Sequence, residues 1–319
     1  MNQHQSIPAH LRYTRKQFDT EFPDDDACLQ TIMDQRYPGG MAQCEKCDAK
    51  RKHHRVTGRT AYACDHCGNH LYPLVGTIFQ KSSTSLRIWF QAMYLMGSTR
   101  CGISAKQIQR ETGVTYKTAW RMFKQIRSLL SEPDMQLEGS TVEMDECYVG
   151  GRPRGHKRRT PKWLNNDRKA IVAGVVERKT GKGRVIAKVV EDASKKTLQD
   201  FAHEFIMPES TVFTDEHPSY TGLDKSGYQH YRIQHAQGIY VKGNVHTQTI
   251  EGFWALVQNG IRGVYHSVSK KYLQTYLDEY SFRYNRRDRG NLIFPAMLAR
   301  VSERVSSKPS APVAENQTV

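Results

Sequence analysis

Three acidic side chains stand where they could bind metal ions together. Asp145 and Asp215 each follow a short apolar segment with strand-like alternation, and Glu251 comes after a further 35 residues, in a segment expected to be helical. Carboxylate oxygens bind Mg²⁺, and two such ions about 4 Å apart support in-line displacement at phosphorus. One acidic residue after a strand is commonplace, but the three in this order predict metal-dependent phosphoryl transfer with these residues as catalytic ligands. Strand alternation places Glu143 on the same face as Asp145, where it could be mistaken for a ligand.

Two C-x-x-C pairs, Cys44 with Cys47 and Cys64 with Cys67, are separated by 16 residues. This spacing is typical of a zinc ribbon. Four thiolates complete a tetrahedral shell without an open position, so we predict one structural Zn²⁺ that stabilises a segment too short and polar to fold by burial alone. Redox chemistry is the alternative for a single C-x-x-C pair, and a repeated pair without a βαβ pattern disfavours it. The histidines that could replace a cysteine ligand are His53, His54, His66 and His70.

Residues 81–131 have the pattern of a helix-turn-helix. Ser104 and Thr115 could each cap a helix, and Gly113 supplies the turn between them. The second helix has an apolar stripe formed by Ala119, Met122, Phe123 and Ile126. Its other face carries Tyr116, Lys117, Arg121, Lys124 and Arg127, which we predict to contact DNA. The alternative is an ordinary helical hairpin with a solvated basic face.

The rest of the chain predicts an α/β domain. A turn-rich segment at 131–140 marks a boundary before it. Predicted strands lie at 141–149, 169–177, 184–190, 211–214 and 229–234, and predicted helices lie at 195–206, 217–223, 247–259 and 269–287. This order indicates a mixed sheet flanked by helices.

The charge of the chain predicts a polyanionic partner. Lys and Arg total 47 against 32 acidic residues, so the formal net charge is +15, and phosphate-backbone binding is the usual reason for such a balance. The segment 150–169 carries eight Lys or Arg and one Asp, and is predicted to be a basic loop that holds DNA. A solvated loop without a specific role is the alternative. The loop residues predicted to bind DNA are Arg152, Arg154, Lys157, Arg158 and Arg159.

The ends of the chain and its hydropathy add three expectations. No stretch approaches the 18 apolar residues of a membrane span, and the first residues lack an apolar signal core, so we expect a cytoplasmic protein without a membrane partner. Residues 1–38 are expected to form a helical arm. Residues 305–319 are polar and lack aromatic side chains, and we expect them to be disordered.

The motifs together resemble a known family. The order of a ribbon at 39–80, a helical block and an acidic-triad domain at 140–300 is similar to bacterial DDE-type insertion-sequence transposases with an N-terminal zinc ribbon. The strings that add to the match are MDECYVGG around Asp145, TDEHPSY around Asp215, HTQTIEGFW around Glu251 and GVYHSVSKKYLQTYLDEYSFRYNRR at 263–287.

The resemblance implies an RNase H-like catalytic domain with two Mg²⁺ or Mn²⁺ ions per active site, both bridged by Asp145. It implies binding to double-stranded DNA at the ends of an insertion element, strand cleavage and transfer to target DNA. Joining two element ends needs two active sites, so we expect a homo-oligomer on DNA, associated with the bacterial nucleoid through that DNA.

Gln258 and Arg262 complete the predicted DNA contacts. Helical spacing places Gln258 on the same face as Glu251. The family pattern has Lys followed by Arg where this chain has Gln258 and Asn259. The remaining alternatives are a catalytically impaired or domesticated descendant, a transcription regulator built from the ribbon and helix-turn-helix, and a structure-specific nuclease of the RNase H type.

Overall fold

The computed structural model describes residues 8, 11–99, 101–133, 135–137, 141–150, 169–179, 183–233, 246–289 and 292–303. The chain forms two compact units. The ribbon unit comprises Arg12–Ser98 and the chain from Phe294 onward, and the sheet unit comprises Thr99–Ile293 with Met1–Leu11. The predicted tail at 305–319 and the predicted basic loop, except for its two end positions, lie outside the described residues. In the described part of the chain, no helix is long and apolar enough to span a membrane.

The ribbon unit contains a small antiparallel sheet preceded by two capped helices. Thr14 and Gln17 form a capping box at the start of the first helix, and Asp24 caps the second. The helices are α1 (Arg15–Glu21) and α2 (Asp25–Arg36), and the strands, in spatial order, are β1 (Met41–Cys44), β2 (Ala49–Arg55), β3 (Tyr62–Cys64) and β4 (His70–Leu71).

Aromatic side chains form the core of the ribbon unit. The rings of Phe18, Phe22, Phe90 and Tyr94 all lie within about 6 Å of one another or of Phe294. They come from α1, the adjoining turn, α3 (Leu86–Ser98) and α9 (Ile293–Glu303). Gly97 is required by this packing, because a Cβ atom there would lie 2.8 Å from the backbone nitrogen of Phe294. The ribbon unit therefore has an apolar centre of its own, apart from any metal.

The sheet unit begins with a helical hairpin, α4 (Ala105–Thr112) and α5 (Tyr116–Ser128). Ser104 caps α4, Thr115 caps α5, and Gly113 between them has φ of 72°, as predicted. A positive φ favours glycine, which has no Cβ atom to clash. The predicted apolar stripe of α5 is also confirmed, since Ala119, Met122, Phe123 and Ile126 are all buried.

A five-stranded mixed sheet follows, in the order β7-β6-β5-β8-β9. Its strands are β5 (Thr141–Val149), β6 (Ala170–Glu177), β7 (Val185–Val190), β8 (Thr211–Thr214) and β9 (Gln229–Arg232). β5 and β6 are antiparallel, as are β6 and β7, whereas β5 with β8 and β8 with β9 are parallel. The predicted strands are confirmed to within two residues at each end. Of the short helix predicted near 217–223, only a single 3-10 turn is present, Pro218–Tyr220, and a second 3-10 turn, Asp224–Ser226, follows the segment.

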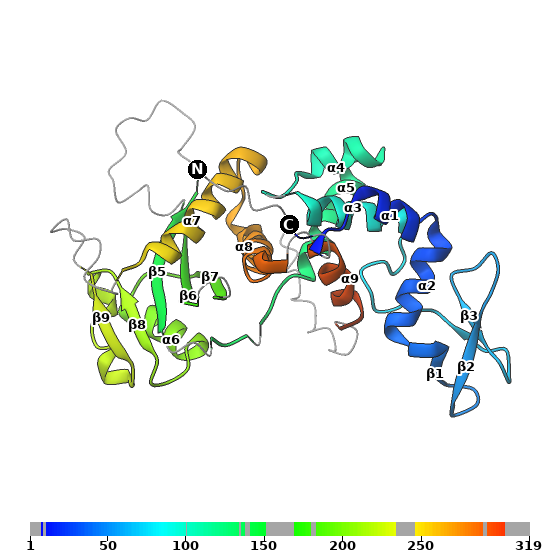
Figure 1. Ribbon diagram of the computed structural model, residues 1–319, viewed down its shortest axis with the longest axis horizontal. Coiled ribbons are helices and arrows are strands. Elements are labelled where there is room, and N and C mark those ends of the chain that lie inside the picture. The colour runs from blue at the N-terminus through cyan, green and yellow to red at the C-terminus, as the bar shows by residue number, and fades with distance from the viewer. Residues whose placement is uncertain are drawn as a thin grey trace, which may run out of the picture. The chain divides into compact units, whose positions relative to one another are not determined.

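Helices cover both faces of this sheet (Figure 1). On one face, α6 (Lys195–Phe205) packs its apolar side on Val142, Met144 and Val212. On the other, α7 (Gln248–Gly260) and α8 (Lys270–Tyr284) pack on Cys147, Val172 and Val176. Because successive strand residues point to opposite faces, the odd-numbered residues of β5 point toward α7. A π-helical turn, Ile261–Tyr265, ends α7.

Side chains of α8 and of its C-cap residue also cover the edge of the sheet at β7. Gln274 accepts a hydrogen bond from the nitrogen of Val189 at 2.8 Å and donates one to the carbonyl of Ala187 at 3.1 Å. Asn285 does the same for Val185, with its oxygen 2.7 Å from the backbone nitrogen and its amide nitrogen 3.1 Å from the carbonyl oxygen. These amides occupy backbone groups that a neighbouring strand would otherwise pair with.

Candidate metal and DNA-binding sites

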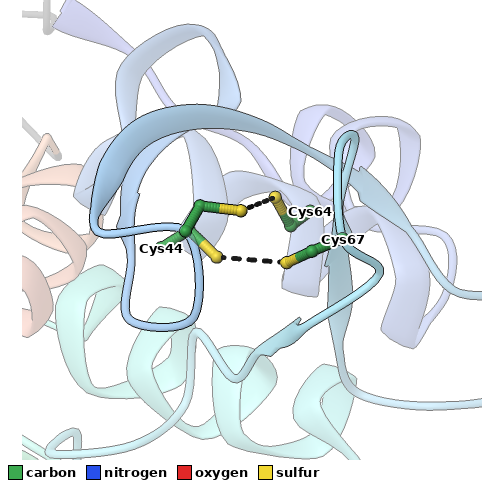
Figure 2. Close-up of side chains that lie close together, drawn as sticks. Cys44, Cys64 and Cys67 are labelled. Atoms are coloured by element: carbon green, nitrogen blue, oxygen red, sulfur yellow. Dashed lines mark hydrogen bonds between the residues drawn. The ribbon is translucent and has the colours of Figure 1, made fainter.

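The four predicted zinc cysteines converge. Cys44 ends β1 and Cys64 ends β3, so the two C-x-x-C turns face each other (Figure 2). The Sγ atoms of Cys44 and Cys67 are 3.5 Å apart, those of Cys47 and Cys64 are 3.9 Å apart, and all four lie within 4.8 Å of one another. Sulfur atoms about 2.3 Å from a tetrahedral zinc would be about 3.8 Å apart. The arrangement fits a structural zinc.

The four thiols share hydrogen bonds, and their ionisation differs. Hydrogen bonding from the backbone of Cys47 lowers the pKa of the Cys44 thiol to about 6, whereas the hydrogen bond with Cys67 raises the pKa of the Cys47 thiol to about 12. Zinc binds the thiolate form. Among the described residues, no histidine belongs to this ligand group. One of the candidate histidines, His53, is buried in β2 with its Nδ1 atom 3.0 Å from the carbonyl oxygen of Arg51.

Two of the predicted catalytic carboxylates come from neighbouring strands. Asp145 lies in β5, and Asp215 follows directly after the last residue of β8. The parallel ladder pairs Thr141 with Thr211 and ends where Glu143 pairs with Phe213. The same offset continued by two residues brings Asp145 opposite Asp215. Parallel pairing therefore brings together two acidic residues that are distant in the sequence.

Glu251 lies in the first turn of α7, the helix that covers this face of the sheet. Its Oε1 atom accepts a hydrogen bond from the Thr247 hydroxyl at 3.0 Å. One turn later, the indole nitrogen of Trp254 donates to Oδ2 of Asp145 at 3.0 Å. Glu251 and Asp145 line one cleft of about 390 Å³. The other lining residues are Glu146, Cys147, Tyr148, Trp254, Ala255 and Gln258.

The cleft is acidic, and this shifts the ionisation of Asp145. Burial, followed by the charges of Glu146 and Asp215, raises the pKa of Asp145 to about 7. A half-buried carboxylate beside other carboxylates is costly to ionise without a counterion. A divalent cation would supply that counterion and would meet the hard oxygen ligands that it prefers.

Only some of the side chains predicted to contact DNA lie on one surface. Lys117, Arg121 and Lys124 are exposed along α5, and the Lys124 ammonium lies 5.5 Å from the ring centre of Tyr272 in α8. Gln258 lines the acidic cleft, where its amide nitrogen is 3.1 Å from Sγ of Cys147 and its oxygen is 3.1 Å from the Arg262 guanidinium. Arg152, Arg154, Lys157, Arg158 and Arg159 lie outside the described residues.

The prediction that Arg127 faces DNA is wrong. Its side chain is 1% exposed, and its Nε atom is 2.7 Å from a carboxylate oxygen of the buried Glu279 in α8. The guanidinium lies between the rings of Phe123 and Tyr276, 3.7 and 3.4 Å from their centres. Arg127 follows Phe123 by one helical turn and so shares the face of α5 that packs on α8.

Three residues that hold carboxylates of the site were not predicted from the sequence. Trp254 and Thr247 bind two of the predicted ligands directly, and Tyr220 donates its hydroxyl to Glu146. Glu143, which the sequence placed on the same face as Asp145, bonds to the first turn of α7. For Trp254 a signal was present, because it follows Glu251 by three residues and must lie near it on a helix.

Comparisons with known proteins agree with this arrangement. Residues 136–285 match the ISXO2-like transposase domain, and residues 23–70 match the transposase zinc-ribbon domain. An uncharacterized protein in the transposable element ISH50 of Halobacterium salinarum is 31% identical over 235 residues, which cover 70% of this chain and 77% of the relative. An uncharacterized transposase-like protein of Haemophilus influenzae is 29% identical over 104 residues, covering 33% of this chain and 83% of that relative. The chain belongs to the insertion-sequence transposases that carry an N-terminal zinc ribbon.

Proposed function

We propose that this transposase binds the ends of an insertion element and catalyses metal-dependent strand cleavage and strand transfer, with Asp145, Asp215 and Glu251 as the metal ligands. The observation that carries the proposal is the convergence of Asp145 and Glu251 on one cleft, with the charge of Asp215 acting on Asp145. Numbered along the chain, the five strands of the sheet unit lie side by side in the order 3-2-1-4-5. This order supports an RNase H-like fold for the sheet unit.

Asp145, Asp215 and Glu251 are the residues that would hold two Mg²⁺ or Mn²⁺ ions. Such ions, when bound, stabilise the attacking and leaving oxygens of an in-line displacement. The protein's part is orientation. Trp254, Thr247 and the backbone nitrogen of His217 each hold one oxygen of a ligand carboxylate, at 3.0, 3.0 and 2.9 Å. Fixed ligands of this kind raise metal affinity and hold the reacting atoms in place.

Two chemical steps follow from this proposal. In the first, water attacks the scissile phosphorus at an element end, the bond from phosphorus to the 3′-oxygen breaks, and a 3′-hydroxyl is released. In the second, that hydroxyl attacks a phosphorus of target DNA, and the target's own 3′-oxygen leaves. Each displacement exchanges one P–O bond for another, and neither requires a covalent protein–DNA intermediate.

The exposed cations of α5 are the proposed contact to the element end. Lys117, Arg121 and Lys124 lie on a helix whose partner, α4, precedes it in a helix-turn-helix arrangement. Gln258 and Arg262 are proposed to contact DNA beside the cleft. Joining two ends needs two active sites, so we propose at least a dimer on DNA. Size-exclusion chromatography with end DNA would contradict this if only a monomer eluted.

The experiment that tests the proposal is cleavage of a labelled duplex carrying the element end, in Mg²⁺ or Mn²⁺. Wild-type protein is expected to leave a 3′-hydroxyl, and Asp215→Ala is expected to bind the duplex without cutting it. Asp224→Ala is the matched control, because Asp224 is an exposed aspartate of the same unit. Cleavage by Asp215→Ala, or cleavage that persists in a chelator of Mg²⁺, would refute the metal site. Binding without cleavage by the wild type would favour a catalytically impaired descendant.

A further inference from the structure

The N-terminus of α7, the helix that carries Glu251, is capped by a side chain from another element. The first backbone N–H groups of a helix have no partner within it and are usually bonded by the N-cap side chain. In α7 the side chain of the N-cap residue Thr247 makes no such bond, and its hydroxyl donates to Glu251. Instead, Oε2 of Glu143 in β5 accepts from the backbone nitrogens of Thr249 and Ile250, at 2.7 and 3.0 Å.

Glu143 is tied to this position by further contacts. It is fully buried, and its Oε1 atom accepts from the Thr249 hydroxyl at 2.8 Å and from Nε of Arg178 at 2.6 Å. Arg178 also donates to the carbonyl of His246, the residue just before the N-cap. A buried carboxylate is stable only with such partners, and the positive end of a helix adds to them. The three bonds from Thr249 and Ile250 thus fasten the start of α7 to the sheet, and Arg178 links Glu143 to the residue before the N-cap.

A second attachment lies on the far side of Glu251. Trp254 donates to Asp145, which points to the same face of β5 as Glu143. Asp145 pairs with Gly174 across the β5–β6 ladder. A Cβ atom at Gly174 would lie 2.5 Å from the Trp254 ring, so the glycine makes room for the indole to reach Asp145. Glu251 therefore sits in the chain between two points at which α7 is bound to the same strand.

We propose that Glu143 is a positioning residue of the active site, one that sets the distance between Glu251 and Asp145 and does not itself bind metal. This inference rests on the proposed function. Without Glu143, all three metal ligands remain, but the first turn of α7 loses its acceptors and can shift relative to β5. A misplacement of about 1 Å can lower a rate on the order of a hundredfold.

Glu177→Gln is the matched control for Glu143→Gln. Glu177 is also a buried glutamate of the same sheet, 1% exposed, and its carboxylate bonds to Arg184 beside the β6–β7 turn. Each substitution removes one buried charge that is paired with an arginine. Glu143→Gln is expected to slow cleavage by roughly 10- to 100-fold with unchanged affinity for the duplex. Glu177→Gln is expected to cleave at nearly the wild-type rate.

Two measurements do not depend on cleavage. Hydrogen exchange at the amides of Thr249 and Ile250 is expected to accelerate in Glu143→Gln and not in Glu177→Gln. Mn²⁺ affinity of the zinc-loaded protein, without DNA, is expected to fall roughly 10-fold with unchanged stoichiometry. If Glu143→Gln does not fold, Thr249→Val replaces it, since it removes only the hydroxyl bond to Glu143 and should produce a smaller loss of the same kind.

Three results would overturn the inference. The first is faster exchange in Glu143→Gln together with wild-type cleavage, and the second is an equal loss in Glu177→Gln, which would indicate a general folding role. The third is the loss of one Mn²⁺ from the stoichiometry, which would make Glu143 a ligand. If the wild type itself does not cleave, the proposed function fails, and the exchange and Mn²⁺ measurements still decide whether Glu143 positions Glu251.

Discussion

The two candidate metal sites differ in how the chain brings their ligands together. In the ribbon unit, each C-x-x-C turn supplies two thiols, and all four Sγ atoms lie within 4.8 Å of one another. In the sheet unit, Asp145, Asp215 and Glu251 come from two strands and a helix, and an oxygen of each is bound to a protein donor. The zinc site thus depends on local turns, whereas the carboxylate site depends on how α7 packs on the sheet.

The largest expected effect comes from removing one ligand of the zinc site. Cys64→Ser should abolish zinc binding and make β1–β4 sensitive to protease, because structural zinc contributes about 10–16 kcal/mol to the folding of small zinc domains. The sheet unit should stay protected, since its apolar core lies in other residues. Zinc content and limited proteolysis measure this. Cys101→Ser, at an exposed cysteine of the sheet unit, is the control, and retained zinc in Cys64→Ser would contradict the ligand assignment.

The next effect concerns the pH dependence of the carboxylate site. With the pKa of Asp145 raised to about 7, a metal must displace a proton below that pH. Mn²⁺ affinity is therefore expected to rise about tenfold per pH unit below 7 and to level off above it. Electron paramagnetic resonance of Mn²⁺ with zinc-loaded protein measures this. Asp145→Asn should bind weakly at every pH, and a pH-independent affinity in the wild type would count against Asp145 as a ligand.

A smaller effect tests the packing directly. Gly174→Ala should destabilise the sheet unit by about 1–3 kcal/mol, as overpacking does in cores, because the added Cβ would meet the Trp254 ring at 2.5 Å. The same change should weaken Mn²⁺ binding and leave zinc content unaltered. Thermal unfolding and metal titration measure the two effects. Unchanged Mn²⁺ affinity would show that the indole contact does not support the carboxylate site.

The smallest expected effect is an increase in stability. Gly252 lies in α7 beside Glu251, is exposed, and has no atom within 4 Å of a Cβ built there. Gly252→Ala should stabilise the protein by about 0.5–1 kcal/mol, because glycine is unfavourable inside a helix, and should leave Mn²⁺ affinity unchanged. A lower unfolding temperature for this variant would mean that the exposed face of α7 is more constrained than its contacts indicate.

Local pattern was enough to predict some of these features. The spacing of the four cysteines predicted the zinc site, and alternation predicted the strand carrying Asp145 within its observed limits. Both signals are contained in a few neighbouring residues. Helical spacing likewise placed Glu251 correctly on a helix.

Other features depend on contacts between distant parts of the chain. Arg127 has the composition of a DNA contact, yet it is buried because its partner Glu279 lies 152 residues away. Glu143 resembles a metal ligand in the sequence, and only the position of α7 reveals its bonds to Thr249. The need for glycine at position 174 follows from ladder register and from the size of an indole, neither of which alternation can predict.

The amides of Gln274 and Asn285 restrict how copies of this protein can associate. Because they occupy backbone groups along β7, a strand from a second molecule cannot extend the sheet there without first displacing them. Assembly through a continuous intermolecular sheet is disfavoured at this edge, and so is the amyloid-like stacking to which bare edges are prone. Any contact between two copies at this edge would therefore be made by side chains and not by a backbone ladder.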